Sequence, residues 1–287
     1  MKDMFIPIAL GIIMLSMGLS LTTADFKRAL LYPKAVLIAL FCQTILMPTV
    51  CFFIVKGMGL GPELAIGLML LAASPGGVTA NLYSHVAGGD VALNITLTAI
   101  NSLLSLVTLP VILGFSLQYF LGTEHTIPLQ TGKVVQVMLI VIVPVLIGMY
   151  LRHLKPAFAL RVEPRLKMLS GLFLLLILIS VFVRQGKELN AYFEVVGVAV
   201  VLFNVLSLVA GYGIALLVRL EKRQAIAISM EVGVHNTALA AGLALSPLLL
   251  NNATIAMPPA LYGVLSLVIV AVFAYMVRYK QPAVKNE

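Results

Sequence analysis

Residues 229–237 read Ser-Met-Glu-Val-Gly-Val-His-Asn-Thr and lie inside the apolar run Ala225–Leu250. That run is long enough to cross a lipid bilayer, for which about 20 apolar residues suffice. It therefore places Glu231, His235 and Asn236 at mid-membrane depth, where a charged side chain costs roughly 2.5–3.5 kcal/mol on insertion scales. Such residues are expected to face a protein-lined or wet cavity, which makes the stretch a candidate functional site. The alternative is that they only hydrogen-bond one helix to another.

The composition of the whole chain indicates a membrane protein. Of its 287 residues, 61% are hydrophobic and 10% are charged, and the mean hydropathy is +1.08. A soluble domain of this length cannot bury so much apolar surface, so an all-α polytopic membrane protein is predicted. A β-barrel would show short alternating segments, whereas this chain has long continuous apolar runs. The net charge of +8 requires no nucleic-acid partner, because Lys and Arg gather in cytoplasmic loops of membrane proteins.

The apolar runs predict nine membrane-spanning segments within one transmembrane domain, residues 1–287. Their bounds are Met4–Leu21, Ala35–Val55, Glu63–Val86, Val91–Leu121, Val134–Leu151, Leu169–Val183, Ala191–Val218, Gln224–Leu249 and Thr254–Val277. The first run is the alternative candidate for a cleaved signal peptide, but it is long for one and an acidic residue precedes it.

The distribution of basic residues predicts the orientation in the membrane. Most of the 19 Lys and Arg residues lie on the side that carries the odd-numbered loops and the C-terminus. The positive-inside rule makes that side cytoplasmic, so the N-terminus is expected outside. The other side carries only Lys2, Lys56, Lys133, Arg184 and Lys187.

Two predicted spans are interrupted in similar ways. The third contains Ser74-Pro75-Gly76-Gly77, where proline removes a backbone donor and two glycines weaken the helix. The eighth contains Gly233 within its polar stretch. The two spans run in opposite directions. Interrupted hydrophobic segments at matching positions of two halves indicate a transporter site between inverted repeats.

Glu231 is the only acidic residue expected deep within a span, and no Lys or Arg is expected at that depth. Its partner is therefore a mobile cation, a proton or His235, which would share its face at i, i+4 of a regular helix. One carboxylate with many neutral oxygens suits a monovalent cation. The other deep polar residues are Gln43, Asn81, Asn94, Thr96, Thr98, Asn101, Asn204, Asn236 and Thr237.

Short motifs spread along the chain carry a family resemblance. They are Leu10–Met14, Met47-Pro48, Pro75–Asn81, Gly89–Leu93 and Glu231–Ala241. On these residues the chain resembles the bile acid:sodium symporter family, particularly its bacterial members. The resemblance implies a bacterial inner-membrane transporter in which two crossed, broken helices hold two sodium ions.

The resemblance also implies a panel domain and a core domain that move against each other in alternating access. The panel helices would be approximately residues 4–21, 134–151 and 169–183. The core helices would lie in residues 35–121 and 191–277. The chain resembles a nine-helix variant that lacks the family's first panel helix, and a monomer in the lipid bilayer is expected.

The resemblance implies positions for both sodium sites. The first would be formed by Ala80, Asn81, Asn94, Thr98 and Glu231. The second would be formed by Gln43, Glu231, Val232, Val234 and His235. The family usually has Gln where His235 stands, and imidazole offers no oxygen to a sodium ion. His235 therefore leaves two alternatives, a single sodium ion per cycle or a proton-sensitive step.

The substrate region implied by the resemblance is Val78, Thr79, Asn236, Thr237 and Ser266. The family often has His-Asn where the chain has a Ser-Leu pair, beginning at Ser266. A smaller carboxylate such as pantoate or a keto acid therefore fits at least as well as a bile acid.

The function expected from the sequence is sodium-coupled symport of an organic anion. The alternative is a proton-coupled or uncoupled organic anion carrier that uses Glu231 and His235. An enzyme is not expected, because no set of nucleophile, base and orienting group stands out. A sensor without transport is the remaining alternative.

Overall fold

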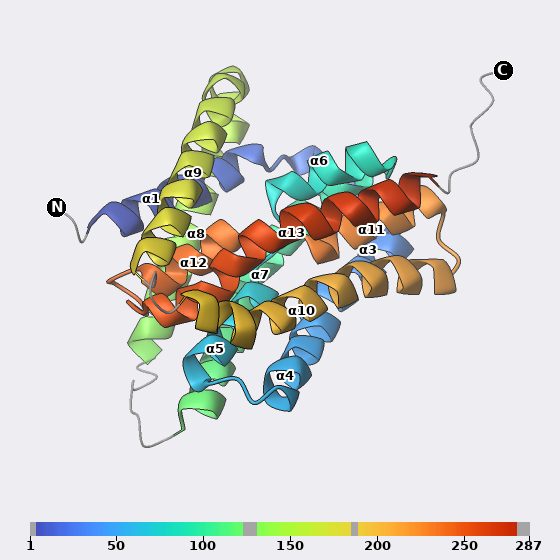
Figure 1. Cartoon of the computed structure of the whole chain (residues 1–287). Coiled ribbons are helices and arrows are strands. Elements are labelled where there is room, and N and C mark those ends of the chain that lie inside the picture. The colour runs from blue at the N-terminus through green and yellow to red at the C-terminus, as the bar shows by residue number, and fades with distance from the viewer. Residues whose placement is uncertain (1–3, 123–130, 185–188, 280–287) are drawn as a thin grey trace.

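The structure is a computed structural model that describes residues 4–122, 131–184 and 189–279. Most of these residues lie in helices (Figure 1). In chain order the elements are α1 (Phe5–Ser20), α2 (Thr23–Ala29), α3 (Pro33–Phe41), the π-helical turn η2 (Cys42–Leu46), α4 (Met47–Gly57), α5 (Pro62–Ala73), α6 (Val78–Ala87), α7 (Val91–Leu121), α8 (Thr131–Leu154), α9 (Pro156–Arg184), α10 (Leu189–Leu217), α11 (Lys222–Gly233), α12 (Thr237–Leu245) and α13 (Ala253–Tyr279).

The described residues form a multi-pass membrane protein. Four stretches are long and apolar enough to cross a bilayer, namely Pro33–Gly57, Val91–Leu121, Phe193–Leu217 and Ala253–Arg278. A fifth is added if α1 and α2, which meet at a bend of 63°, count as one span. The helices broken in mid-span are each too short to cross alone, since about 20 residues are needed.

Both predicted interruptions are confirmed. The first broken span consists of α5 and α6, separated by residues 74–77, which contain the proline and the paired glycines. The second consists of α11 and α12, separated by residues 234–236. The Asn236 side chain caps α12 by accepting a hydrogen bond from the Leu239 N–H at 3.0 Å. These local signals in the sequence are what end each helix.

The helix that contains the sixth predicted span begins earlier than that span. The sequence suggested a polar loop up to Leu169, whereas α9 begins at Pro156. Proline is well tolerated at a first helical position, where its missing N–H is not needed. Glu163 and Lys167 then form an i, i+4 ion pair, which supports a helix. The helix therefore continues beyond its apolar part.

Helices α1, α8 and α9 pack together (Figure 1). Gly18 of α1 and Gly148 of α8 permit the close approach, because a Cβ at Gly18 would collide with the backbone of Val145. A Cβ at Gly148 would lie 2.6 Å from the Leu15 carbonyl oxygen. Small residues at such contacts are a usual way to pack helices in membranes. Helix α1 also contacts α12, so this group adjoins the second broken span.

Candidate functional site

The two breaks meet and pair through their backbones. Gly76 and His235 form an isolated antiparallel β-bridge. The Gly77 N–H donates to the Val234 carbonyl at 2.8 Å, and the Asn236 N–H donates to the Pro75 carbonyl at 2.9 Å. Buried backbone groups that leave a helix need such partners. Each break therefore provides hydrogen-bond partners for the backbone of the other, and this pairing holds the two halves of the chain together at one crossing.

Glu231 lies in the last turn of α11 beside this crossing, and its side chain is fully buried. Thr98 donates a hydrogen bond to Glu231 Oε2 at 2.6 Å, and Asn101 donates to Oε1 at 2.9 Å. Among the described residues, no Lys or Arg forms an ion pair with it. Within the described part of the chain, the carboxylate is thus hydrogen-bonded but has no counter-charge.

Gly76 lies directly against that carboxylate. A Cβ at this position would collide with Glu231 Oε1 and lie 2.5 Å from its carboxyl carbon. Only glycine permits the backbone of the first break to approach so closely. The glycine pair therefore does more than interrupt the helix, because it brings the α5–α6 break against the acidic side chain.

Of the residues predicted for the first sodium site, Thr98 contacts Glu231, and the others lie on α6 and α7. Thr98 donates a hydrogen bond to Glu231. Asn94 donates to the carbonyl of Ala227, which lies on α11 like Glu231, at 2.8 Å. Ala80 is fully buried on α6, so only its backbone carbonyl can serve as a ligand. Asn81 follows it on α6 and lines a cavity of about 170 Å³ together with Thr98.

Several buried oxygens near the carboxylate have no donor. The Oδ1 atoms of Asn81, Asn94 and Asn101 are all buried without a hydrogen-bond partner. Buried polar atoms are normally paired, so these amide oxygens are free to accept an electropositive ligand. Amide and carboxylate oxygens are ligands for hard cations, and a single carboxylate suits a monovalent one. The first site therefore fits a sodium ion.

Gln43 and His235, predicted for the second sodium site, lie together. Gln43 is in the π-helical turn and donates from Nε2 to the Ser74 carbonyl at 3.1 Å. The same Nε2 is 3.4 Å from His235 Nδ1, which is itself 3.3 Å from the Ser74 carbonyl oxygen. Gln43 Oε1 and His235 Nε2 are buried and have no partner. Among the described residues, His235 bonds Gln43 and Ser74 whereas Glu231 bonds Thr98 and Asn101, so no hydrogen bond joins the two side chains.

The backbone carbonyls predicted for the second sodium site are not equally free to bind a cation. The Val234 carbonyl already accepts the Gly77 N–H, and Val232 is fully buried within α11. The carbonyl between them, Gly233, accepts hydrogen bonds from Asn204 at 2.8 Å and from the Tyr262 hydroxyl at 2.7 Å.

The imidazole of His235 is held between aromatic rings. It stacks on Phe203, with ring centroids 5.1 Å apart, and meets Tyr262 edge-on at 5.5 Å. These two rings were not predicted, since single aromatic residues in apolar runs look like ordinary core. The imidazole is therefore fixed by packing as well as by Gln43.

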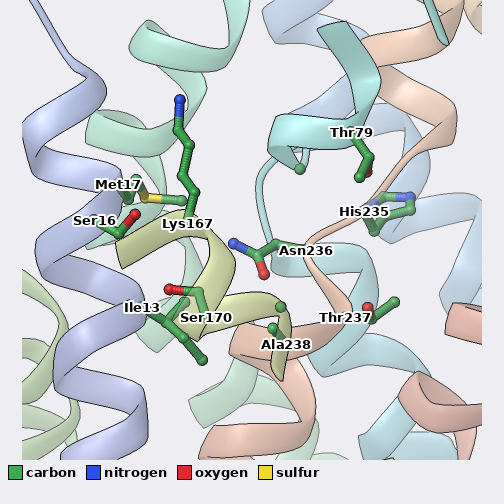
Figure 2. A pocket seen from close by; sticks show the side chains of 12 residues that line it. Ile13, Ser16, Met17, Thr79, Lys167, Ser170, His235, Asn236, Thr237 and Ala238 are labelled. Atoms are coloured by element: carbon green, nitrogen blue, oxygen red, sulfur yellow. The ribbon is translucent and has the colours of Figure 1, made fainter. Parts of the chain in front are cut away.

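A cavity of about 260 Å³ opens beside the crossing (Figure 2). Thr79, Asn236 and Thr237, all predicted for the substrate region, line it. Ser266 is buried on α13 and does not line it, and the side chain of Val78 lies outside the described part of the chain. Three of the five predicted residues thus share one cavity.

The opposite wall of the cavity comes from α1 and α9. Ser16 and Met17 of α1 and Lys167 and Ser170 of α9 line that side of it (Figure 2). The sequence assigned Lys167 to a cytoplasmic loop and gave Ser170 no role. The only hint in the sequence that these two residues share a helix face was their i, i+3 spacing at the start of an apolar run. The cavity therefore lies between the two predicted domains.

A helical membrane protein in which two broken spans meet at a buried carboxylate has the architecture of a secondary transporter. The sequence pattern of the Sodium Bile acid symporter family matches residues 7–191, and the chain belongs to that family.

Named relatives agree with this assignment. The uncharacterized sodium-dependent transporter YocS of Bacillus subtilis (strain 168) is 29% identical over 241 residues, which are 84% of this chain and 73% of the relative. The probable sodium/metabolite cotransporter BASS2, chloroplastic, of Oryza sativa subsp. japonica is 27% identical over 90% of the chain and 60% of its own length. The sodium-dependent organic anion transporter of Rattus norvegicus is 28% identical over 81% of the chain and 62% of its own length. All three are named as sodium-dependent transporters or sodium cotransporters.

Proposed function

We propose that this protein is a symporter that couples sodium entry to the uptake of a small organic anion. One observation carries the proposal: Glu231 is buried without a protein cation, beside three unpaired amide oxygens, where two broken spans meet. A lone buried carboxylate needs a counter-charge, and this set of oxygens favours a hard monovalent cation. The sodium-dependent relatives support sodium as that cation.

The cavity at the crossing supports a small carboxylate as substrate. Its volume of about 260 Å³ is below the roughly 300–1,000 Å³ usual for drug-sized ligands. The first residues of α6 and α12 adjoin it through Thr79 and Thr237. The positive ends of two helix dipoles favour an anion there. Pantoate or a keto acid is therefore a better candidate than a bile acid.

The proposed mechanism is alternating access of a nine-span carrier in a bacterial inner membrane, with the N-terminus outside and the C-terminus inside. Helices α1, α8 and α9 form the panel, and the remaining spans form the core. Cation binding at Glu231 and substrate binding at Asn236 act on the same pair of breaks. Each ligand therefore raises the affinity for the other, because coupling free energies are reciprocal.

The experiment is uptake of radiolabelled carboxylates by the purified full-length protein in proteoliposomes. An inward sodium gradient is expected to drive accumulation, and a potassium gradient of equal ionic strength is not. Equal accumulation with both ions would contradict sodium coupling.

A proton-coupled carrier is the second candidate, favoured by the unpaired, buried Nε2 of His235. A pH gradient in sodium-free buffer would then drive uptake.

A further inference from the structure

Lys167 is a cation at the edge of the substrate cavity that the sodium sites do not require. Its Nζ pairs with Glu163 Oε1 at 2.5 Å, one turn earlier on α9. The same carboxylate pairs with Arg152 at 3.3 Å and accepts a hydrogen bond from the Ser20 hydroxyl at 2.9 Å. Glu163 therefore remains well paired without Lys167.

The charged groups around Lys167 leave a surplus of positive charge. Asp25, the other acidic residue lining the smaller cavity, accepts hydrogen bonds from Thr22 and pairs with Arg28 at 3.5 Å. Glu163 alone balances both Arg152 and Lys167. These three side chains therefore sum to one positive charge, which an anionic ligand would offset.

Lys167 lines both cavities, so its side chain lies at their junction. Its carbon chain borders the larger cavity while its ammonium points away from Asn236 (Figure 2). Ser170, one turn further along α9, also lines the larger cavity, and its hydroxyl is buried without a partner. The cavity thus has a polar panel wall opposite the polar core wall of Thr79 and Asn236.

We propose that Lys167 binds a second acidic group of the substrate and so makes small dicarboxylates the preferred class. This inference rests on the proposed function. One carboxylate binds at the first turns of α6 and α12, and the other takes the Lys167 ammonium from Glu163. The exchange leaves no charge unpaired, because Glu163 keeps Arg152 and Ser20. A buried ion that loses its only partner would be far more costly.

The test compares dicarboxylates of four to six carbons with their monoamides, which keep the length but carry one charge fewer. Binding is measured on the full-length protein in saturating sodium. The wild type is expected to bind at least one dicarboxylate about tenfold more tightly than its monoamide, a difference of about 1.4 kcal/mol. Lys167→Gln removes that difference, because it weakens the binding of the dicarboxylate and leaves the binding of the monoamide unchanged. Lys167→Arg keeps it, and Lys155→Gln, which changes a lysine that lines neither cavity, leaves it intact.

Two readouts keep this inference separate from the proposed function. Sodium-dependent thermal stabilisation is expected to persist in Lys167→Gln, because the oxygens around Glu231 are unchanged. Glu163→Gln frees the ammonium and is expected to preserve or raise dicarboxylate affinity. Equal weakening of both probes in Lys167→Gln, or a wild type with no preference for dicarboxylates, overturns the inference while sodium-dependent transport stands. Loss of sodium dependence in the wild type overturns the proposed function instead.

Discussion

Glu231 receives hydrogen bonds from Thr98 and Asn101, yet nothing in the described protein balances its charge. Glu231→Gln removes the charge while keeping the size of the side chain. A ligand present at 100 times its Kd and bound only by the folded state stabilises it by about 2.7 kcal/mol. We expect sodium to raise the unfolding temperature of the wild type in this way, but not that of the variant. The measurement is thermal unfolding in sodium against potassium at constant ionic strength.

The matched control is Thr96→Val, because the Thr96 hydroxyl is buried but bonds only the Ala92 carbonyl of its own helix. It should retain the sodium response. A normal response in Glu231→Gln would remove this residue from the cation site.

Gly76 provides an independent probe of the same contact. In Gly76→Ala the new methyl group must displace the Glu231 carboxylate or the α5–α6 break. Overpacking of this kind typically costs about 1–3 kcal/mol, so we expect lower thermal stability and a lost sodium response. Gly213→Ala is the control, since a Cβ there meets nothing within 4 Å. If both alanine variants behave alike in sodium titrations, the close approach has no functional role.

At the scale of a single helix, Asn236 has two roles, because it caps α12 and lines the substrate cavity. Two substitutions separate these roles. Asn236→Ala removes the cap, which typically costs about 1 kcal/mol. Asn236→Asp retains a capping oxygen but places a negative charge beside an anion site. We therefore expect Ala to lower the unfolding temperature, and Asp to preserve it while weakening carboxylate binding in isothermal titrations. Undiminished carboxylate binding by the Asp variant would exclude Asn236 from the anion site.

The elements also show where sequence reasoning succeeds. The breaks were predictable because proline and glycine act locally, and α7 was predicted residue for residue from its apolar run. The π-helical turn around Gln43 and the pairing of the two breaks were not, since both depend on partners distant in sequence.

The same division between local features and distant contacts applies to the site. The spacing of Asn94, Thr98 and Asn101 predicted one shared helix face. Thr98 and Asn101 both donate to Glu231, while Asn94 donates to the Ala227 carbonyl of α11. Lys167 was missed because a polar segment beside an apolar run was interpreted as a loop. Only the packing of α1 and α9 against α12 reveals that it borders a cavity.

At the scale of the whole molecule, the proposed alternating access requires α1 to move relative to α12. Leu10 of α1 and Gly242 of α12 suit a disulfide, because a Cβ on Gly242 would lie 4.0 Å from the Leu10 Cβ. We expect oxidation of the Leu10→Cys, Gly242→Cys double variant to stop uptake, and a reductant to restore it. Sodium-dependent stabilisation should persist, since the cation residues lie on other elements. The control is Leu10→Cys alone under the same oxidant. Continued uptake by the cross-linked protein would exclude movement at this contact.

The two breaks are held together by their backbones, whereas side chains determine which ligands the site binds. The bonds from Gly77 to Val234 and from Asn236 to Pro75 use only main-chain atoms. Replacing the side chain of Val234 or His235 therefore leaves these bonds available. In evolution, such a frame can be inherited unchanged while single substitutions alter which ion or anion it accepts.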